Sequence, residues 1–453
     1  MSSPKEPFYQ RTLANPLIRR VLKNAAYLFS ASGISVVLGF FQNLLVTNLL
    51  GVALFGILGG VVKFTSVLNK LGSFRMNELV VRYVGDSLEQ GDERRAAAVF
   101  KFAALVEAGS SLFSFGLIML LAPVGARFLA KDIAFSQVFA LYGLIVVGNL
   151  FFESASGLLQ ILDRFRLIAV MQVIQTVITL LLIAWAYLAG GGLTAVVLAY
   201  MAGKLINGVG VALLAGLEAG RQLGPGWLKV PIASLRGEFR ALLKFAFSTN
   251  ISATINLVNK DSEELWVLLL RNPTEAGWYK QAIALANLVL IPISPLPQAT
   301  YPELAREVAR KAWDNVRYVL RQGSRLAALY SGVAALVLVV FGRWLIARLY
   351  TPAFLPAYPA LLILLVGLLI ANTFYWNRTA LLSLNLPAYP TKVNASAAVA
   401  KIALGLLLVP RYGYLVSAAL LAGYYLFSIS LNARKTYREI GLRERAGVQI
   451  RDI

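Results

Sequence analysis

The sequence contains no cysteine and no histidine. These absences exclude disulfide frameworks, thiolate and imidazole metal sites, and catalysis by a cysteine or histidine nucleophile. Charged residues are also scarce, at 14% of 453 residues, whereas a soluble protein would have about a quarter. Hydrophobic residues make up 58% of the chain, and apolar runs of about twenty residues recur along it. The composition therefore predicts a polytopic membrane protein.

The sequence also lacks the phosphate-binding loop of an ATP-driven pump. The Gly-Lys pair at Gly203 and Lys204 has neither the first glycine nor the hydroxyl residue of the G-x-x-x-x-G-K-[ST] motif. No segment shows the alternating ten-residue pattern of a membrane β-barrel. We therefore expect no enzymatic activity, no metal site and no cofactor, apart from a coupling ion that the sequence leaves open between H+ and Na+.

The apolar runs predict an all-α chain of twelve membrane-spanning helices. The first run is too long for a signal-peptide core and has no small-residue cleavage site, so we expect it to be retained. The predicted spans are 21–49, 53–73, 98–122, 133–160, 167–189, 193–216, 242–270, 276–297, 325–349, 357–383, 392–409 and 413–432.

Basic residues fix the predicted orientation of these spans. With both termini in the cytoplasm, the inner segments hold 30 of the 43 lysines and arginines, and the outer segments hold six. Cytoplasmic loops of membrane proteins carry such an excess. The net charge of +21 is therefore attributed to loops on one membrane side, and no nucleic-acid partner is expected.

Two weak internal matches share nearly one offset, which predicts a repeat. Gly56 matches Gly277 at an offset of 221 residues, and LLQILDRF from Leu158 matches LLSLNLPA from Leu381 at an offset of 223. Six helices per repeat give both halves the same orientation. We therefore predict two pseudo-symmetric six-helix bundles around a central cavity.

The repeat and the charge pattern set the predicted divisions of the chain. These are a cytoplasmic leader at 1–20, an N-terminal bundle at 21–216, a cytoplasmic linker at 217–241, a C-terminal bundle at 242–432 and a basic cytoplasmic tail at 433–453. Within the second bundle, the segment 302–324 has apolar residues at every fourth position among arginines. It is predicted to form an amphipathic helix on the cytoplasmic surface.

The stretch from Arg240 to Arg271 is apolar enough to cross a bilayer, yet it carries four internal charges. A charge at the centre of the hydrocarbon costs roughly 2.5–3.5 kcal/mol, so these groups should face protein or water. Asn256, Lys260 and Glu263 fall on one helical face. In the sequence repeat this helix is the equivalent of the first span, which has its own polar face. We therefore predict that both helices line the central cavity.

The deep polar residues form three groups of candidate site residues. Buried cations would attract an anionic head group, amides would bind sugars, and acids could couple transport to an ion. An ion pair between Lys260 and Glu264, one turn apart, is an equal alternative for Lys260. The candidates are Lys63, Lys204, Lys260 and Lys401 with the amides Gln42, Asn43 and Asn256 for substrate binding, and Glu153, Asp261, Glu263 and Glu264 for ion coupling.

Four segments together resemble a known family. They are LGVALFGILG after the first span, LLQILDRFRLIAVMQV between the fourth and fifth, the Ala276–Tyr279 turn through Pro302–Ala305, and LVPRYGYLVSAAL. The chain resembles the Wzx-type polysaccharide transporters (O-antigen flippases) of the multidrug/oligosaccharidyl-lipid/polysaccharide (MOP) flippase superfamily.

The resemblance implies alternating access in the cytoplasmic membrane of a bacterium or archaeon. Its usual cargo is a polyprenyl-pyrophosphate-linked oligosaccharide for O-antigen, capsule or exopolysaccharide, moved to the outer leaflet among membrane lipids. Polysaccharide polymerases and glycosyltransferases would be its partners.

Three other functions stay open at this point. A multidrug antiporter of the same superfamily would favour an acidic or aromatic cavity, whereas deep lysines favour an anion. A lipid II-type flippase is closer in chemistry but usually has two additional helices. A scaffold role in a polysaccharide assembly complex would need no transport at all. A membrane glycosyltransferase is disfavoured because the predicted outer loops are very short.

Overall fold

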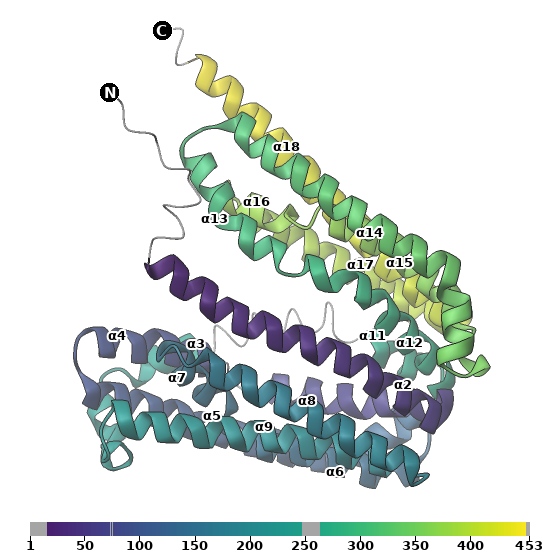
Figure 1. The fold of residues 1–453 in the computed structure, drawn as a ribbon, viewed down its shortest axis with the longest axis horizontal. Helices are drawn as coiled ribbons and strands as arrows, with labels where there is room; N and C mark the ends of the chain where they lie inside the picture. Colours follow the sequence, from purple (N-terminus) through teal and green to yellow (C-terminus); the bar gives the residue numbers. More distant parts are fainter. Residues whose placement is uncertain (1–15, 73, 75, 247–262, 450–453) are drawn as a thin grey trace. The chain divides into compact units, whose positions relative to one another are not determined.

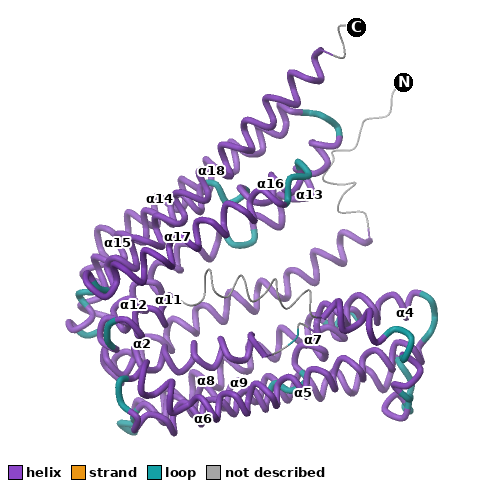
Figure 2. The backbone as a smooth tube through the Cα atoms, turned by 180° about the vertical axis from the view of Figure 1, so that it is seen from behind, coloured by secondary structure: helices purple, strands orange, loops and turns teal. Residues whose placement is uncertain are grey.

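A computed structural model describes residues 16–449, apart from 73, 75 and 247–262. Among these residues all regular elements are helical and no strand occurs (Figure 2). Nine helices in this part of the chain are long and apolar enough to cross a membrane, and one of them, Ser30–Gly72, overlaps two of the predicted spans. The all-α membrane fold is confirmed, and the count of twelve helices stays a prediction.

The first half of the chain runs through α2 to α9, which Figure 1 labels, and several short turns of other helix types. They are α2 (Pro16–Gly72), α3 (Met76–Leu79), η1 (Val80–Val84), α4 (Gly85–Glu89), α5 (Glu93–Gly125), η2 (Ala126–Ala130), η3 (Ile133–Phe135), α6 (Ser136–Gly148), α7 (Phe152–Ile161), α8 (Phe165–Leu188), α9 (Leu193–Gln222), η4 (Trp227–Lys229) and η5 (Ile232–Leu235).

The second half is described from residue 263 onward. Its helices are α11 (Glu263–Leu270), α12 (Pro273–Leu290), η7 (Ile291–Ile293), α13 (Leu296–Ala309), α14 (Trp313–Leu349), η8 (Pro352–Phe354), α15 (Ala357–Thr373), α16 (Asn377–Ser383), α17 (Ala388–Tyr412) and α18 (Tyr414–Gln449).

Gly51 divides α2 into two helical stretches. Its backbone has φ 68° and ψ −179°, a conformation that only glycine adopts without strain. The break lies between the predicted spans 21–49 and 53–73. The predicted boundary between these spans therefore coincides with the interruption of the helix.

Two predicted spans are each interrupted in the structure. The span 133–160 consists of α6 and α7 with a turn at 149–151 between them, and the span 357–383 consists of α15 and α16 with a turn at 374–376. The two turns lie 225 residues apart, close to the offset of the sequence repeat. Discontinuous helices at corresponding positions of two repeats are typical of transporters.

The backbone repeats a second feature at this spacing. Positive φ angles occur at three pairs of positions separated by 220, 222 and 223 residues: Gly91 and Lys311, Asp163 and Asn385, and Gly190 and Gly413. Left-handed conformations are uncommon and mark specific turns. Their recurrence at one spacing supports the internal repeat that the sequence matches predict.

The contacts divide the chain into two compact units. The first comprises Met1–Leu50, Val61–Phe128 and Asp132–Val258, and the second comprises Gly51–Gly60, Leu129–Lys131 and Asn259–Ile453. In the first unit α5 packs on α6 and α8 packs on α9, and in the second α15 packs on both α14 and α18. Exposed leucine, valine and phenylalanine side chains line α5, α8, α9 and α14, as expected of helices that face lipid.

The predicted amphipathic segment 302–324 differs in the structure. It belongs to two helices, α13 and α14, which are separated by a turn in which Lys311 has φ 56°. Its apolar residues Leu304, Val316 and Leu320 are fully buried in a core that α16 and α18 also supply. The apolar positions therefore pack against protein. The predicted tail from 433 is likewise a continuation of α18.

Candidate functional site

A polar cavity of about 380 Å³ lies within the first unit. Two lysines and two glutamates take part in its wall, together with hydroxyl and amide side chains. The cavity is lined by residues from α2 (Val62, Thr65, Ser66, Asn69, Lys70), α5 (Glu107, Ser111), α6 and the turn after it (Tyr142, Ile145, Val146, Asn149), α7 (Phe152, Glu153) and α9 (Lys204), and by Phe74.

Lys204 is the cation of α9 that lines this cavity. It has no ion pair or hydrogen bond with any residue that the structure describes, and its side chain is exposed to the cavity. Glu153, at the start of α7, lines the same cavity. The structure therefore brings together one predicted substrate-binding cation and one predicted ion-coupling acid.

Glu107 of α5 holds the beginning of α7 in place. Its carboxyl group accepts hydrogen bonds from the main-chain N–H groups of Glu153 at 2.7 Å and Ser154 at 2.8 Å, and from the Ser154 hydroxyl. The first N–H groups of a helix have no partner within the helix, so a carboxylate from a neighbouring helix can cap them. Glu107 is only 2% exposed, and it positions Glu153 at the cavity wall.

Replacing Glu107 by alanine should destabilise the fold. Two N–H groups at the start of α7 would lose their acceptor in a buried environment, at a cost of about 1–3 kcal/mol for each unsatisfied group. The measurement is thermal unfolding of the purified protein in detergent. Glu93→Ala is the matched control, because Glu93 is an exposed acid on the same helix. Equal melting temperatures for both variants would refute the capping role.

Other candidates of the first unit lie outside this cavity. The Gln42 amide is buried and donates a 2.8 Å hydrogen bond to the main-chain oxygen of Thr176 on α8. Asn43 is half-buried and accepts a hydrogen bond from Thr47 through its main-chain oxygen. Lys63 is half-buried on α2 and is not among the residues of the cavity wall. The polar face of the first span thus packs in part against α8.

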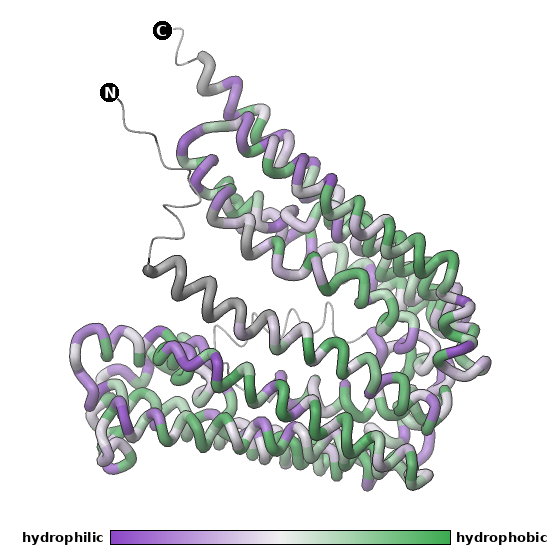
Figure 3. Tube along the Cα trace, in the orientation of Figure 1, coloured by the Kyte–Doolittle hydropathy of each residue, from purple (hydrophilic) through white to green (hydrophobic). Residues whose placement is uncertain are grey.

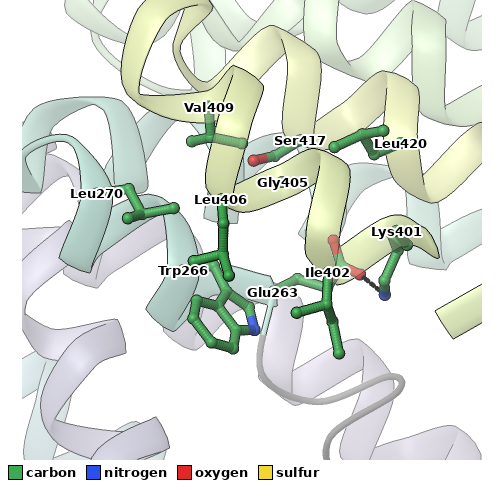
Figure 4. A pocket seen from close by; sticks show the side chains of 10 residues that line it. All are labelled: Glu263, Trp266, Leu270, Lys401, Ile402, Gly405, Leu406, Val409, Ser417 and Leu420. Atoms are coloured by element: carbon green, nitrogen blue, oxygen red, sulfur yellow. Dashed lines mark hydrogen bonds and ion pairs between the residues drawn. The ribbon is translucent and has the colours of Figure 1, made fainter. Parts of the chain in front are cut away.

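A buried ion pair joins α11 and α17 in the second unit. Lys401 Nζ contacts Glu263 Oε1, both side chains being 9% exposed, and the Tyr279 hydroxyl donates to Glu263 Oε2 at 2.9 Å. Figure 4 shows this pair at the edge of a small pocket with Trp266 and Ser417. The pocket of about 30 Å³ has room for about two water molecules.

Glu264, the next residue, packs against Gly59 of α2. A Cβ atom at Gly59 would lie 1.5 Å from Glu264 Oε1, so the absent side chain makes room for the carboxylate. Lys280 of α12 lies 4.0 Å from the same oxygen. Its ammonium also donates to the main-chain oxygen of Phe55 at 3.1 Å and lies 3.9 Å from the centre of the Phe55 ring. Glu264 therefore has a cation partner from another helix.

Three of the predicted site residues, Asn256, Lys260 and Asp261, lie outside the described residues. Three residues that the structure adds to these clusters, Glu107, Tyr279 and Lys280, are not among the predicted site residues. The sequence could have indicated Glu107 as a site residue, since it is an acid in the middle of an apolar span. Tyr279 and Lys280 sit near a span end, where interfacial positions are common, so only the packing of α12 reveals their role.

Comparison with known proteins identifies the family of the chain. The family described as polysaccharide biosynthesis protein matches residues 21–307. The chain belongs to this family. It is 24% identical over 352 residues to the inner membrane protein YghQ of Escherichia coli (strain K12), an alignment that covers 76% of this chain and 96% of that protein. The chain is thus a multi-pass membrane protein of a transporter family, as its resemblance implied.

Solved structures share the fold at low sequence identity. An inward-facing multidrug resistance MATE family transporter of the MOP superfamily has a TM-score of 0.70 at 11% identity, covering 91% of this chain and 96% of that one. Lipid II flippase MurJ in an inward closed conformation has a TM-score of 0.68 at 13% identity, covering 93% and 92%. A MOP superfamily transporter from Pyrococcus furiosus has a TM-score of 0.62 at 10% identity, covering 98% and 99%. The fold is that of the MOP superfamily.

Proposed function

We propose that this protein is a flippase for a polyprenyl-pyrophosphate-linked oligosaccharide. It moves the cargo from the inner to the outer leaflet of the cytoplasmic membrane by ion-coupled alternating access, with both termini in the cytoplasm. Membership of a polysaccharide biosynthesis family and a fold shared with a lipid II flippase support this assignment. Glycosyltransferases would supply the cargo and a polysaccharide polymerase would consume it.

The observation that carries the proposal is Lys204, which lies in the wall of a large polar cavity without an acid partner among the described residues. A lysine at membrane depth with no such partner is costly to maintain, and such residues mark substrate or ion pathways. A pyrophosphate would supply a compensating negative charge. Hydroxyl and amide groups around it, such as Ser66, Asn69 and Asn149, can form hydrogen bonds with sugar hydroxyls.

Two acids are the candidates for binding the coupling ion. Glu153 lines the cavity that contains Lys204, and Glu263 is paired with Lys401 in the wall of the small pocket of the second unit. Protonation or Na+ binding at either carboxylate would change the charge that the lysine experiences. Uptake of the ion at Glu263 would release Lys401 from its ion pair, and uptake at Glu153 would increase the positive charge of the cavity that contains Lys204. Either change would link the ion gradient to cargo binding.

The test is transport of a fluorescent lipid-linked oligosaccharide by protein reconstituted into proteoliposomes. Lys204→Ala should lower the initial rate by about tenfold or more, because a hydrogen bond to a charged group contributes about 1.5–3 kcal/mol, and Lys204→Arg should retain most of the rate. Lys392→Ala is the matched control, an exposed lysine at the beginning of α17. Unchanged transport in Lys204→Ala would reject the assignment of this cation.

A second measurement identifies the cargo. Deletion of the gene should lead to accumulation of the lipid-linked glycan that the protein transports, which mass spectrometry of the membrane lipids would detect. If no glycan accumulates, drug export or a scaffold role takes the place of the proposed function.

A further inference from the structure

Two long helices of the second unit continue beyond their apolar stretches. The 37 residues of α14 span about 55 Å at 1.5 Å per residue, well over the bilayer core of about 30 Å. Its first thirteen residues are mostly polar, and exposed apolar side chains begin at Leu326. Figure 3 shows the same change along α14, and hydrophilic residues near the end of α18.

This extension is folded against its neighbours. Val316 and Leu320 of α14 belong to the same buried core as Ile440 of α18. Arg317 of α14 also forms a two-pronged ion pair with Glu444 of α18. The N-terminal turns of α14 are therefore packed against α18, and their remaining side chains are left on the solvent-exposed side of the helix.

That other face carries an open groove of about 360 Å³ lined by Asp314, Arg317, Tyr318, Arg321, Gln322 and Arg325. Arg317 is already bound to Asp314 at 3.7 Å and to Glu444. Arg321 and Arg325 are exposed and have neither an ion pair nor a hydrogen bond with any described residue. The groove therefore presents two guanidinium groups, one turn apart on α14, that no acid in the described part of the chain neutralises.

The position of the groove indicates its occupant. Arg325 is followed on the same face by Leu329 and Val333, which are 67% and 56% exposed, as expected of apolar side chains that face lipid. Arg321 and Arg325 are thus placed at the boundary between the apolar surface and water, where the phosphates of the bilayer lie. Tyr318, 65% exposed in the groove, is typical of the same interfacial depth.

We propose that this groove binds an anionic phospholipid of the surrounding bilayer. Arg321 and Arg325 hold its phosphate oxygens, since guanidinium groups bind phosphate through paired N–H donors. Its acyl chains lie along the exposed apolar side chains of α14 from Leu326 onward. The site anchors the extension of the second unit at the membrane surface and does not depend on which cargo the protein moves.

Native mass spectrometry of the full chain in detergent tests this site, with cardiolipin, phosphatidylglycerol or phosphatidylcholine added. Wild type should retain the anionic lipids in preference to phosphatidylcholine. R321Q/R325Q should bind them on the order of ten- to thirtyfold more weakly, given roughly a fivefold step for each arginine near an anionic surface. R343Q/R348Q is the matched control, because it removes two exposed arginines from the far end of the same helix, and it should bind as wild type does.

Two results would overturn the proposal. In the first, R321Q/R325Q binds cardiolipin and phosphatidylglycerol as tightly as wild type while its melting temperature shows an intact fold. In the second, inorganic pyrophosphate or a polyprenyl pyrophosphate occupies the groove and the bilayer lipids do not, which would make it a cargo site. A melting temperature of R321Q/R325Q equal to that of R343Q/R348Q separates loss of binding from loss of structure.

Discussion

Replacing Lys401 by methionine is expected to destabilise the second unit by about 3–5 kcal/mol, the cost of leaving one member of a buried ion pair without its partner. Glu263 would keep its hydrogen bond from Tyr279 but would lose the cation that offsets its charge. Methionine has nearly the length of lysine, so the loss of packing is small. The melting temperature of the purified protein in detergent should fall accordingly.

A second variant distinguishes charge from packing at this site. The double variant Lys401→Met/Glu263→Gln removes both charges and should recover much of the lost stability, because a neutral pair avoids an unpaired buried charge. Lys392→Met, an exposed lysine on the same helix, should melt close to wild type. If the double variant is less stable than Lys401→Met alone, the ion pair is not the source of the effect.

Replacing either Gly56 or Gly277 by alanine is expected to separate two helices that are in direct backbone contact. A Cβ atom at Gly56 would lie 2.0 Å from the main-chain oxygen of Pro273, and one at Gly277 would lie 2.2 Å from that of Val52. Both clashing atoms belong to the backbone, which cannot relieve the clash by changing rotamer as a side chain can. Overpacking of this kind costs about 1–3 kcal/mol or more, so thermal unfolding should show a clear loss of stability.

Glycines in open positions of the same unit provide the control. A Cβ atom at Gly332 of α14 or at Gly423 of α18 would have no neighbouring atom within 4 Å, so alanine there should be tolerated or slightly stabilising. Equal melting temperatures for Gly277→Ala and Gly332→Ala would show that the helices can separate without cost. The contact is also reciprocal, since Gly56 meets Pro273 while Gly277 meets Val52. Gly56 and Gly277 are 221 residues apart, as are Val52 and Pro273.

The order of the helices could be predicted well from the sequence, because hydropathy reports directly on membrane spans. The turn near Gly51 was placed correctly, since glycine and a change of pattern mark it. The turns at 149–151 and 374–376 could not be predicted. They contain no proline or glycine, and both lie inside apolar runs. The turn before α7 depends on Glu107 from α5, a partner that only the fold supplies.

The candidate site was predictable in composition but not in pairing. A charged residue within an apolar run is visible in the sequence alone. This position identified Lys204, Lys401, Glu153 and Glu263 as unusual. Which charges meet depends on contacts between distant segments. Lys401 and Glu263 are 138 residues apart in the sequence. Local spacing offered Lys260 as the partner of Glu264, a pair that lies outside the described residues and stays a prediction. Lys280, which lies 4.0 Å from Glu264, could not be identified as a neighbour from local spacing.

The cap that Glu107 provides for α7 has a consequence for how the first cavity would attract an anion. The N-terminal end of a helix that opens into a cavity is ordinarily an anion site. Here the protein's own carboxyl group already occupies that end, so an arriving phosphate would have to compete with an internal ligand for it. Attraction toward this wall must therefore come from lysine ammonium groups such as that of Lys204. Glu153 lines the same cavity, so uptake of a proton or Na+ by its carboxylate would change the strength of this attraction, whereas a helix end has a fixed charge.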